Sequence, residues 1–436
     1  MSKLPLSGKY FLQVPEGVTY GDWTGAALPP VTLFDAHRDQ LVANLFGNPH
    51  SAHGPSMRSS DEAMAARSAI LKYFNAPEEE YDVIFTPSAT GAIRLLEHYK
   101  FEGGELLLLE DNHNSVNGLR ETAKRKGATC TRYAPIKADL TIDDEALEQM
   151  LQGSRSSGQK LFAFPAKSNY TGNTHSLDCV RYAKKYGWDV LLDAAAYSSN
   201  RRLNLSVIKP DFVPISFYKM FGYPTGIGCL IIRKEAFNRL HKGWFTGGPI
   251  RIVSVKNDFF VPEGQNHALY EDGTIAFSSI PAVRNGLDFL ESLGDISAHA
   301  VSIATKLYDQ LDLLGDDVNG PMVYTDRGSD TVTFNIMKSR KIVGPWIFEE
   351  YANKNNVYVR TGCFCNPGVN EKIFDYSVKP LMNMKNDDIA SGKVVLDTIR
   401  QNTDNPVGAI RVSFGYANTE ADATRVAEVV KKFLAE

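Results

Sequence analysis

An alternation of short apolar runs with helical patterns is the feature that most constrains this chain, and it extends from about residue 55 to residue 235. Each apolar run ends in a turn rich in glycine, serine or asparagine, which is typical of crossover units around a mostly parallel sheet. Ala63, Ala66, Ile70 and Phe74 mark one face of a helix in this stretch. Strands are predicted over 82–86, 105–110, 160–164, 188–193, 212–216 and 228–233. The pattern predicts one large α/β domain.

The sequence after Pro281 has a different texture. A helix stops at Gly294, strand-like runs follow, and a final helix begins at a cap formed by Thr419 and Asp422. The strand-like runs are 331–336, 356–360 and 409–414. This order predicts a smaller α+β domain. The expected organisation is an N-terminal segment that packs with the small domain, 1–40, a large domain, 41–285, and the small domain, 286–436.

Composition excludes several classes of protein. The 436 residues carry 47 Lys and Arg against 51 Asp and Glu, and the net charge of −4 is spread along the chain. This distribution does not indicate binding to nucleic acid or to an anionic membrane. Five cysteines are too few and too unevenly spaced for a disulfide framework. No apolar run approaches the roughly 20 residues of a membrane helix, and no signal peptide is visible, so we expect a cytoplasmic protein.

Two charged residues follow predicted strands of the large domain. Lys219 comes shortly after the run 212–216 and precedes Met220 and Phe221. A desolvated amine there has a lowered pKa and is available for a Schiff base; the alternative is a surface lysine whose stem lies on apolar neighbours. Asp193 ends another run, at the edge where open α/β sheets bind ligands. It either pairs with a buried cation such as a protonated pyridine nitrogen, or it caps a helix.

Small hydroxyl residues mark a strand-to-helix turn at 86–96. The backbone amides of Ser88, Ala89 and Thr90, with two hydroxyls among them, are suited to phosphate, although an ordinary capped helix has the same residues. His113 follows the next apolar run. It either stacks on a planar cofactor or moves protons, or it is a solvated loop histidine.

Two arginines and two cysteines mark the predicted small domain. A glycine- and proline-rich turn with Cys363 and Cys365 follows Arg360. A thiol near a guanidinium is a candidate nucleophile. Because no second Cys/His pair stands at zinc spacing, Cys-x-Cys does not predict a metal site. Arg411 lies on a predicted strand, where it holds a carboxylate in a bidentate fork or pairs at the surface.

A strand-end aspartate, a strand-end lysine in a glycine-rich turn and a phosphate-type helix start follow the order expected of a pyridoxal phosphate enzyme. The chain resembles the class V aminotransferase superfamily, and within it the desulfurase domain of molybdenum cofactor sulfurases, over residues 20–436. The segments that carry the resemblance include Asp211-Phe-Val-Pro-Ile-Ser-Phe-Tyr-Lys219, Phe221-Gly-Tyr-Pro-Thr-Gly-Ile-Gly228, Tyr270-Glu-Asp-Gly-Thr274 and Arg360-Thr-Gly-Cys-Phe-Cys-Asn366. It implies fold type I, with a large domain built on a mostly parallel sheet and a smaller α+β domain.

The resemblance also implies a role for each candidate residue. Lys219 would bind pyridoxal 5'-phosphate and move the substrate's α-proton. Asp193 would pair with the pyridine nitrogen, and His113 would stack on the ring. Cys365 would form a persulfide. The remaining contacts to cofactor and substrate would come from Ser88, Ala89, Thr90, Asn169, Ser216, Tyr218, Thr274 of a second subunit, Arg360 and Arg411.

The implied activity converts L-cysteine to alanine in a homodimer, with a persulfide on Cys365 that passes to a separate sulfur acceptor. Cysteine desulfurases generally carry Gln three residues after the aspartate, where this chain has Ala196. A second hypothesis is therefore another class V enzyme, a C–S lyase or an epimerase, in which Cys365 is not the nucleophile. A third is a cofactor-free binding protein, against which the intact Lys219 and Asp193 argue.

Overall fold

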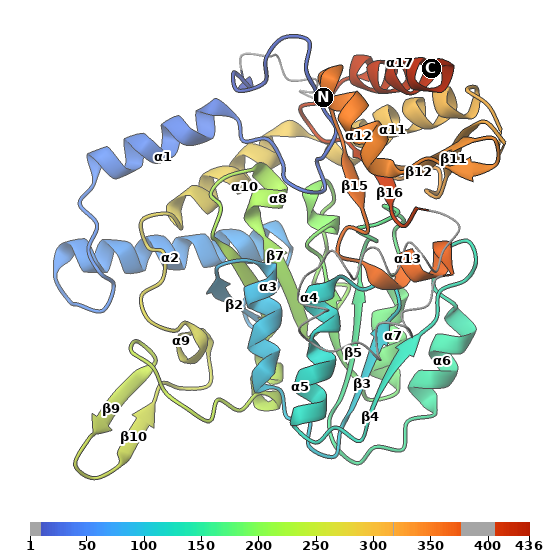
Figure 1. The fold of residues 1–436 in the computed structure, drawn as a ribbon. Helices are drawn as coiled ribbons and strands as arrows, with labels where there is room; N and C mark the ends of the chain where they lie inside the picture. Colours follow the sequence, from blue (N-terminus) through green and yellow to red (C-terminus); the bar gives the residue numbers. More distant parts are fainter. Residues whose placement is uncertain (1–9, 317, 376–405) are drawn as a thin grey trace.

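The computed structural model describes residues 10–316, 318–375 and 406–436, and its architecture is built on two main sheets (Figure 1). The larger sheet has seven strands in the order β2-β8-β7-β6-β5-β3-β4. They are β2 Tyr81–Thr86, β3 Glu105–Leu109, β4 Cys130–Ala134, β5 Lys160–Pro165, β6 Asp189–Asp193, β7 Phe212–Ser216 and β8 Gly228–Arg233. Strand β8 is antiparallel to both of its neighbours, and the other pairs are parallel. All carboxyl ends except that of β8 therefore lie along one edge, where ligands of such sheets bind.

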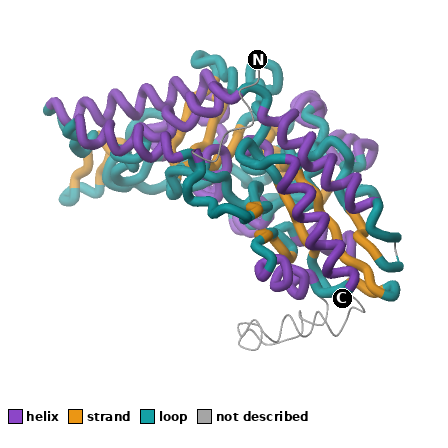
Figure 2. Tube along the Cα trace, turned by 90° about the horizontal axis from the view of Figure 1, so that it is seen from above, coloured by secondary structure: helices purple, strands orange, loops and turns teal. Residues whose placement is uncertain are grey.

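Helices cover both faces of this sheet, so that the strands lie between helical layers (Figure 2). Every residue of β3, β6 and β7 is buried, as continuous apolar runs require of a sheet covered on both sides. The helices of this part are α1 Val31–Ala43, α2 Gly54–Tyr73, α3 Ala89–Arg94, α4 Asn114–Asn117, α5 Leu119–Arg125, α6 Asp144–Gln152, α7 Asp178–Lys185, α8 Phe217–Phe221, α9 His267–Tyr270 and α10 Pro281–Leu293.

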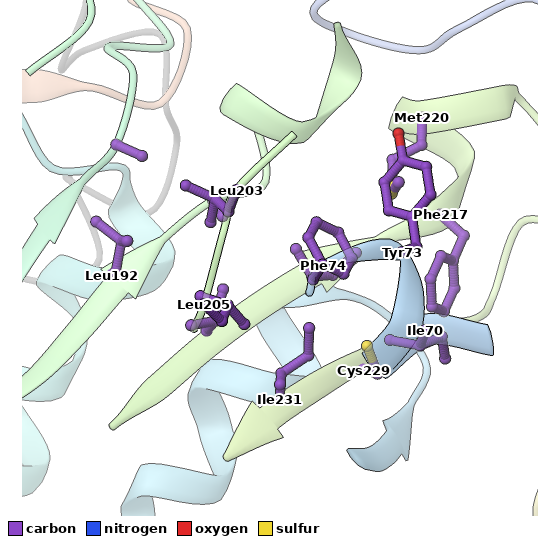
Figure 3. Close-up of a cluster of buried hydrophobic side chains, with 14 of the residues drawn as sticks. Ile70, Tyr73, Phe74, Leu192, Leu203, Leu205, Phe217, Met220, Cys229 and Ile231 are labelled. Carbon is purple, nitrogen blue, oxygen red and sulfur yellow. The ribbon is translucent and has the colours of Figure 1, made fainter. Parts of the chain in front are cut away.

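The predicted apolar helix face belongs to α2 and its C-cap. Ala63, Ala66, Ile70 and Phe74 are each at most 4% exposed, which confirms that prediction. Figure 3 shows Ile70 and Phe74 among side chains from the sheet, including Ile231 of β8. This packing fixes the sheet against the layer that contains α2 and α10.

The smaller sheet has the order β11-β12-β16-β15, with β13 beside β12. Its elements and their neighbours are α11 Ile296–Asp312, β11 Gly320–Val323, β12 Thr331–Lys338, β13 Lys341–Ile342, α12 Pro345–Lys354, β14 Val357–Tyr358, β15 Arg360–Gly362, α13 Pro367–Phe374, β16 Ala409–Ser413 and α17 Glu420–Ala435. The predicted cap is confirmed, because Thr419 and Asp422 form a reciprocal capping box on α17. Figure 1 shows this sheet above the carboxyl edge of the large one.

The start of the chain joins this smaller sheet. Strand β1, Thr19–Tyr20, pairs in parallel with β14, and α1 packs against α10. A hairpin of β9, Ile250–Ser254, and β10, Phe259–Pro262, projects from the large part of the molecule (Figure 1). The domain boundaries near residues 40 and 285 stay predictions.

The sequence analysis did not predict one strand of the large sheet, and one predicted strand of the small domain was wrong in detail. Strand β4 was missed because it is half-buried and carries Thr131 and Arg132, so it lacks the apolar run of the central strands. The single strand predicted over 356–360 is two strands, since β14 pairs with β1 whereas β15 pairs with β16. Among the described residues, no helix is long and apolar enough to cross a membrane, and no group of His, Cys, Asp or Glu is placed to hold a metal ion.

Candidate active site

A cavity lies at the carboxyl edge of the large sheet. The side chains that line it come from the ends of β2, β3, β5, β6 and β7. Nine of the residues predicted to bind the cofactor line it: Ser88, Ala89, Thr90, His113, Asn169, Asp193, Ser216, Tyr218 and Lys219. These residues are spread over 132 positions of the sequence, from 88 to 219. The parallel strands bring them together because their carboxyl ends lie at one edge.

Lys219 lies in the short helix α8, which begins directly after β7. Burial lowers the pKa of its ammonium group below the usual lysine value. Asp193 acts in the opposite direction, and the charges of Arg411 and Lys167 add to the decrease. Gly222 ends α8 with a φ of 79°, and a Cβ there would lie 2.4 Å from the Pro29 nitrogen. Lys219 is half-buried and lines the cavity, and its lowered pKa makes the free amine more available than that of an exposed lysine.

Asp193 at the end of β6 and His113 after β3 approach the same cavity from strands on either side of β5. Asp193 is 8% exposed, and its Oδ1 accepts a hydrogen bond from the Ala195 amide at 3.0 Å. The Nδ1 atom of His113 accepts from the Ser115 amide at 3.1 Å, so the neutral ring carries its proton on Nε2. Burial lowers the pKa of His113, against the opposing effect of Asp193.

Hydroxyl and amide groups gather at the start of α3. The Ser88 hydroxyl caps this helix by accepting from the Gly91 amide at 3.2 Å, so the capping interpretation holds for its side chain. The Ala89 amide donates to Ser216 Oγ at 2.8 Å, and the hydroxyls of Thr90 and Ser115 lie 2.8 Å apart. These groups give the cavity one end that is rich in small hydrogen-bonding atoms.

The two candidate arginines are not equivalent. The Arg411 side chain is 4% exposed and donates to the Asn169 carbonyl at 2.6 Å and to Asp22 Oδ1 at 2.9 Å. Its Nε has no hydrogen-bond partner among the residues that the structure describes. The Arg360 side chain is 54% exposed and lies 3.4 Å from Asp22. Asp22 was missed by the sequence analysis, because a lone aspartate in an irregular N-terminal segment gives no signal of its distant partners.

Cys365 lies in a turn that follows β15, and it is exposed, as is Cys363. Phe364 and Cys365 have φ values of 52° and 57°, so the segment is not extended. The Cys365 carbonyl accepts from the Asn114 amide at 2.7 Å, which places this residue beside His113. Asn169 Nδ2 donates to the Phe364 carbonyl at 2.6 Å. The backbone of the cysteine turn is therefore tied to Asn114, beside His113, and to Asn169, which lines the cavity.

Asn366, at the end of the cysteine turn, attaches the turn to two neighbouring side chains through hydrogen bonds. It is fully buried and donates to Asp111 Oδ1 at 2.6 Å and to Asn169 Oδ1 at 3.0 Å. Asp111 also accepts from Ser168 Oγ at 2.8 Å and lies 2.6 Å from His175 Nε2. The sequence analysis missed Asp111, whose partners lie up to 255 positions away.

Thr274 is the one predicted cofactor-binding residue that lies outside the cavity. It lines a separate groove with Thr86, Pro87 and Gly91, and its Oγ1 accepts a weak bond from Asn48 at 3.4 Å. Within one chain it therefore does not line the cavity of Lys219, and its expected role in a second subunit stays a prediction.

Solved structures of low sequence identity share this fold. The apo structure of a cysteine desulfurase from Thermococcus onnurineus NA1 has a TM-score of 0.80 at 20% identity, and the match covers 100% of both chains. The cysteine desulfurase CsdA from Escherichia coli has a TM-score of 0.77 at 19% identity and covers 98% of this chain and 97% of its own. The predicted fold is confirmed as that of fold type I pyridoxal phosphate enzymes.

The model of the family aminotransferase class V matches residues 19–426, so the chain belongs to this family. Molybdenum cofactor sulfurase of Oryza sativa subsp. japonica is 34% identical over 94% of this chain and 55% of its own length. The Danio rerio protein of the same name is 32% identical over 93% of this chain and 52% of its own length. The chain thus spans about half the length of these relatives.

Pyridoxal phosphate is the cofactor of this family, as predicted. The cavity fits it, because an amine of lowered pKa, a buried carboxylate and a cluster of hydroxyls and amides face one space. A Cβ at Gly228 would lie 2.4 Å from the Ile215 carbonyl oxygen and 2.7 Å from the Ser88 carbonyl carbon, so only glycine allows this close approach beside the hydroxyl cluster.

Proposed function

We propose that this protein is a pyridoxal phosphate-dependent cysteine desulfurase that converts L-cysteine to alanine and leaves a persulfide on Cys365. One observation carries the proposal: the turn that holds Cys365 is hydrogen-bonded to Asn114, next to His113 and the cavity of Lys219. A thiol carried by this turn would reach a substrate bound in the cavity. Names of the relatives, which include cysteine desulfurase and molybdenum cofactor sulfurase, support the same activity.

Each residue of the cavity would have a separate role in binding the cofactor and in moving the substrate proton. Bound pyridoxal phosphate would supply an electron sink that makes the α-proton of the substrate acidic. Lys219 would hold the cofactor and move this proton, Asp193 would keep the pyridine nitrogen charged, and the His113 ring would lie over the cofactor. Phosphate contacts would come from the amides and hydroxyls of Ser88, Ala89, Thr90, Ser216 and Tyr218. Asn169 would face the phenolic oxygen.

Sulfur transfer then needs one nucleophile and one carboxylate anchor. The Cys365 thiolate would attack the substrate sulfur, so that a new S–S bond forms and the C–S bond breaks. The electron pair of the C–S bond passes to the β-carbon of the substrate, and a proton added to that carbon gives the methyl group of alanine. Arg411 is the buried anchor, and Arg360 is the exposed one. Arg411 is bonded to Asp22, so substrate binding would exchange one carboxylate for another.

A second function is favoured by one observation. Ala196 lines the cavity where cysteine desulfurases generally carry Gln, so its side chain gives no hydrogen bond to the cofactor. The alternative is a C–S lyase or epimerase of the same family in which Cys365 is not the nucleophile.

The experiment that tests the proposal uses L-cysteine and measures alanine, sulfide released by a thiol reductant, and the mass of the Cys365 peptide. Cys365→Ser should keep the cofactor but lose alanine and persulfide. Cys363→Ser is the matched control, since this thiol is also exposed two residues away, and it should keep most turnover. Product formation by Cys365→Ser at nearly the wild-type rate would establish the lyase-type alternative.

Assembly and partners belong to the same proposal. We infer a homodimer in which Thr274 of one chain completes the phosphate site of the other, a separate sulfur acceptor, and a cytoplasmic location. The position of Thr274 outside its own cavity supports the homodimer, and the free thiols of the described cysteines support the location.

A further inference from the structure

Two arginines of the small sheet contact the same carboxylate. Arg360 of β15 and Arg411 of β16 stand directly opposite each other in the antiparallel ladder, a register in which like charges destabilise a sheet. Asp22 Oδ1 accepts from Arg411 Nη2 at 2.9 Å, and Asp22 Oδ2 lies 3.4 Å from Arg360 Nη1. The side chains of Arg411, Asp22 and Arg360 are 4%, 18% and 54% exposed. The carboxylate therefore lies between a buried and an exposed guanidinium group.

The buried arginine is connected to the wall of the cofactor cavity. Arg411 Nη1 donates to the Asn169 carbonyl at 2.6 Å, and Asn169 lines the cavity. The guanidinium carbon of Arg411 also lies 4.6 Å from the centre of the Phe364 ring, which belongs to the cysteine turn. These contacts make Arg411, more than the exposed Arg360, suited to hold the carboxylate of a substrate.

The hydrogen-bonding capacity of Arg411 is only partly used. A carboxylate binds a guanidinium group most strongly through two parallel N–H bonds. Asp22 makes a single bond to Arg411, and its second oxygen lies beside Arg360. The Nε atom of Arg411 is buried and has no hydrogen-bond partner within the described part of the chain. The contact with Asp22 is therefore weaker than the bidentate pair that a free carboxylate could form.

The side chain of Asp22 is not needed to hold its own segment in place. The Gly21 amide donates to the Tyr358 carbonyl at 2.8 Å, and the Ser413 amide donates to the Gly21 carbonyl at 2.8 Å. A Cβ at Gly25 would collide with the Asp22 carboxylate, so the segment leaves room for this group. Because backbone bonds fix the segment, the carboxylate is left to act on the arginines.

We propose that Asp22 is a positioning residue that acts through Arg411, as an internal competitor for the substrate carboxylate: it occupies Arg411 in the free protein and moves to Arg360 when an amino acid binds. This inference rests on the proposed role of Arg411 as the substrate anchor. Two guanidinium groups and one carboxylate leave one positive charge unbalanced in this trio. An incoming carboxylate balances it, so that each arginine has a partner of its own. Because alanine carries the same carboxylate as cysteine, the return of Asp22 to Arg411 favours release of the product.

The test compares two ligands that differ by the carboxylate alone. L-Alanine and ethylamine both carry an amine and a methyl group, and the absorption spectrum of the bound cofactor reports the binding of either one to the holoenzyme. In Asp22→Asn the side chain keeps its shape and an oxygen for Arg411 but loses its charge. This variant should bind L-alanine about three- to tenfold more tightly than the wild type and bind ethylamine equally well. The KM for L-cysteine should fall by a similar factor, without an increase in kcat.

Two further variants make the result specific. Glu291→Gln removes the same charge from another arginine pair, in which Glu291 Oε1 lies 3.0 Å from Arg202 Nη2 and neither residue lines the cavity. It should leave both affinities unchanged. Asp22→Ser also removes the charge and has a smaller side chain. It should give the same selective gain for L-alanine, and it serves if Asp22→Asn does not fold.

A double-mutant cycle tests where Asp22 goes. Arg360→Gln should bind L-alanine less tightly than the wild type, because Asp22 then has no second guanidinium group to move to. Relative to Asp22→Asn, the variant Asp22→Asn/Arg360→Gln should lose little affinity. An equal loss in both backgrounds would show that Arg360 acts without Asp22 and would overturn the exchange.

The other outcomes separate this inference from the proposed function. Weaker binding of L-alanine by both Asp22 variants would show that Asp22 holds Arg411 for the substrate, and it would overturn the competition. Equal changes for L-alanine and ethylamine, or the same change in Glu291→Gln, would also overturn it. A wild-type protein that binds L-alanine but forms none from L-cysteine would overturn the proposed function and leave this inference standing. A wild-type protein with no response to L-alanine would overturn both.

Discussion

Replacement of Asp111 by alanine tests whether the cysteine turn is held by a buried polar hub. The Asp111 carboxylate is 1% exposed and has three polar partners, Ser168 Oγ, Asn366 Nδ2 and His175 Nε2, at 2.6 to 2.8 Å. A bond to a charged acceptor is worth about 1.5 to 3 kcal/mol, so three of them set an upper limit of about 9 kcal/mol. Asn366 keeps its hydrogen bond to Asn169, so the loss of free energy is smaller than this upper limit. We expect a loss of about 3 to 5 kcal/mol in the free energy of unfolding.

The asparagine variant separates charge from shape. In Asp111→Asn the amide oxygen still accepts from Ser168 and Asn366, and the His175 ring can change tautomer to accept from the new amide. The expected loss is only about 1 to 2 kcal/mol. Asp139→Ala, which removes an exposed acceptor of Thr141, is the surface control and should cost about 0.5 kcal/mol.

Urea unfolding followed by the fluorescence of buried Trp188 measures these differences. The same preparations are then assayed with L-cysteine. Asp111→Ala should bind cofactor, because the Lys219 cavity is intact, yet form alanine more slowly, because Asn366 no longer holds the cysteine turn. A loss below about 1 kcal/mol in Asp111→Ala would refute the hub. Full loss of cofactor binding in Asp111→Asn would contradict the expectation that Asp111 positions the cysteine turn without affecting the cofactor cavity.

Three further variants address assembly, protonation and packing. Thr274→Ala should hold the cofactor less tightly in equilibrium dialysis, and sedimentation that finds a fully active monomer would contradict the shared site. Because burial lowers the pKa of His113, the unfolded chain binds its proton first as pH falls through about 6.5. Wild-type stability should therefore decrease below that pH relative to His113→Asn, and parallel urea midpoints would contradict this. Gly228→Ala should cost about 1 to 3 kcal/mol and weaken cofactor retention, whereas Gly54→Ala, which meets no atom within 4 Å, should do neither.

The sequence was most informative where local pattern and tertiary environment agree. The central strands are continuous apolar runs because both faces of the sheet are covered, so their positions could be predicted to within a residue or two. The edge strand β4 is half-buried and carries polar residues, so its sequence has no continuous apolar run. Lys219 and Asp193 could be predicted because each follows a run that ends at the ligand edge.

Residues whose role depends on one distant contact could not be predicted. Asp22 lies 389 positions from Arg411, and Asp330 lies 163 positions from Lys167. Neither aspartate stands in a pattern that differs from an ordinary turn. Their partners are fixed only when the small sheet settles on the carboxyl edge of the large one.

The loop between β5 and α7 joins the cysteine turn to the wall of the Lys219 cavity. Asn169 bonds to the cysteine turn through both ends of its side chain, while its carbonyl accepts from Arg411. The carbonyls of Tyr170, Thr171 and Gly172 accept from Thr333, Thr325 and Ser329 of the small-sheet region. A Cβ at Gly172, where φ is 81°, would lie 2.5 Å from Ser329 Oγ, so the loop meets this region at contact distance. Since apolar packing has no preferred direction and hydrogen bonds do, this loop, more than the apolar core, sets where Cys365 lies relative to Lys219.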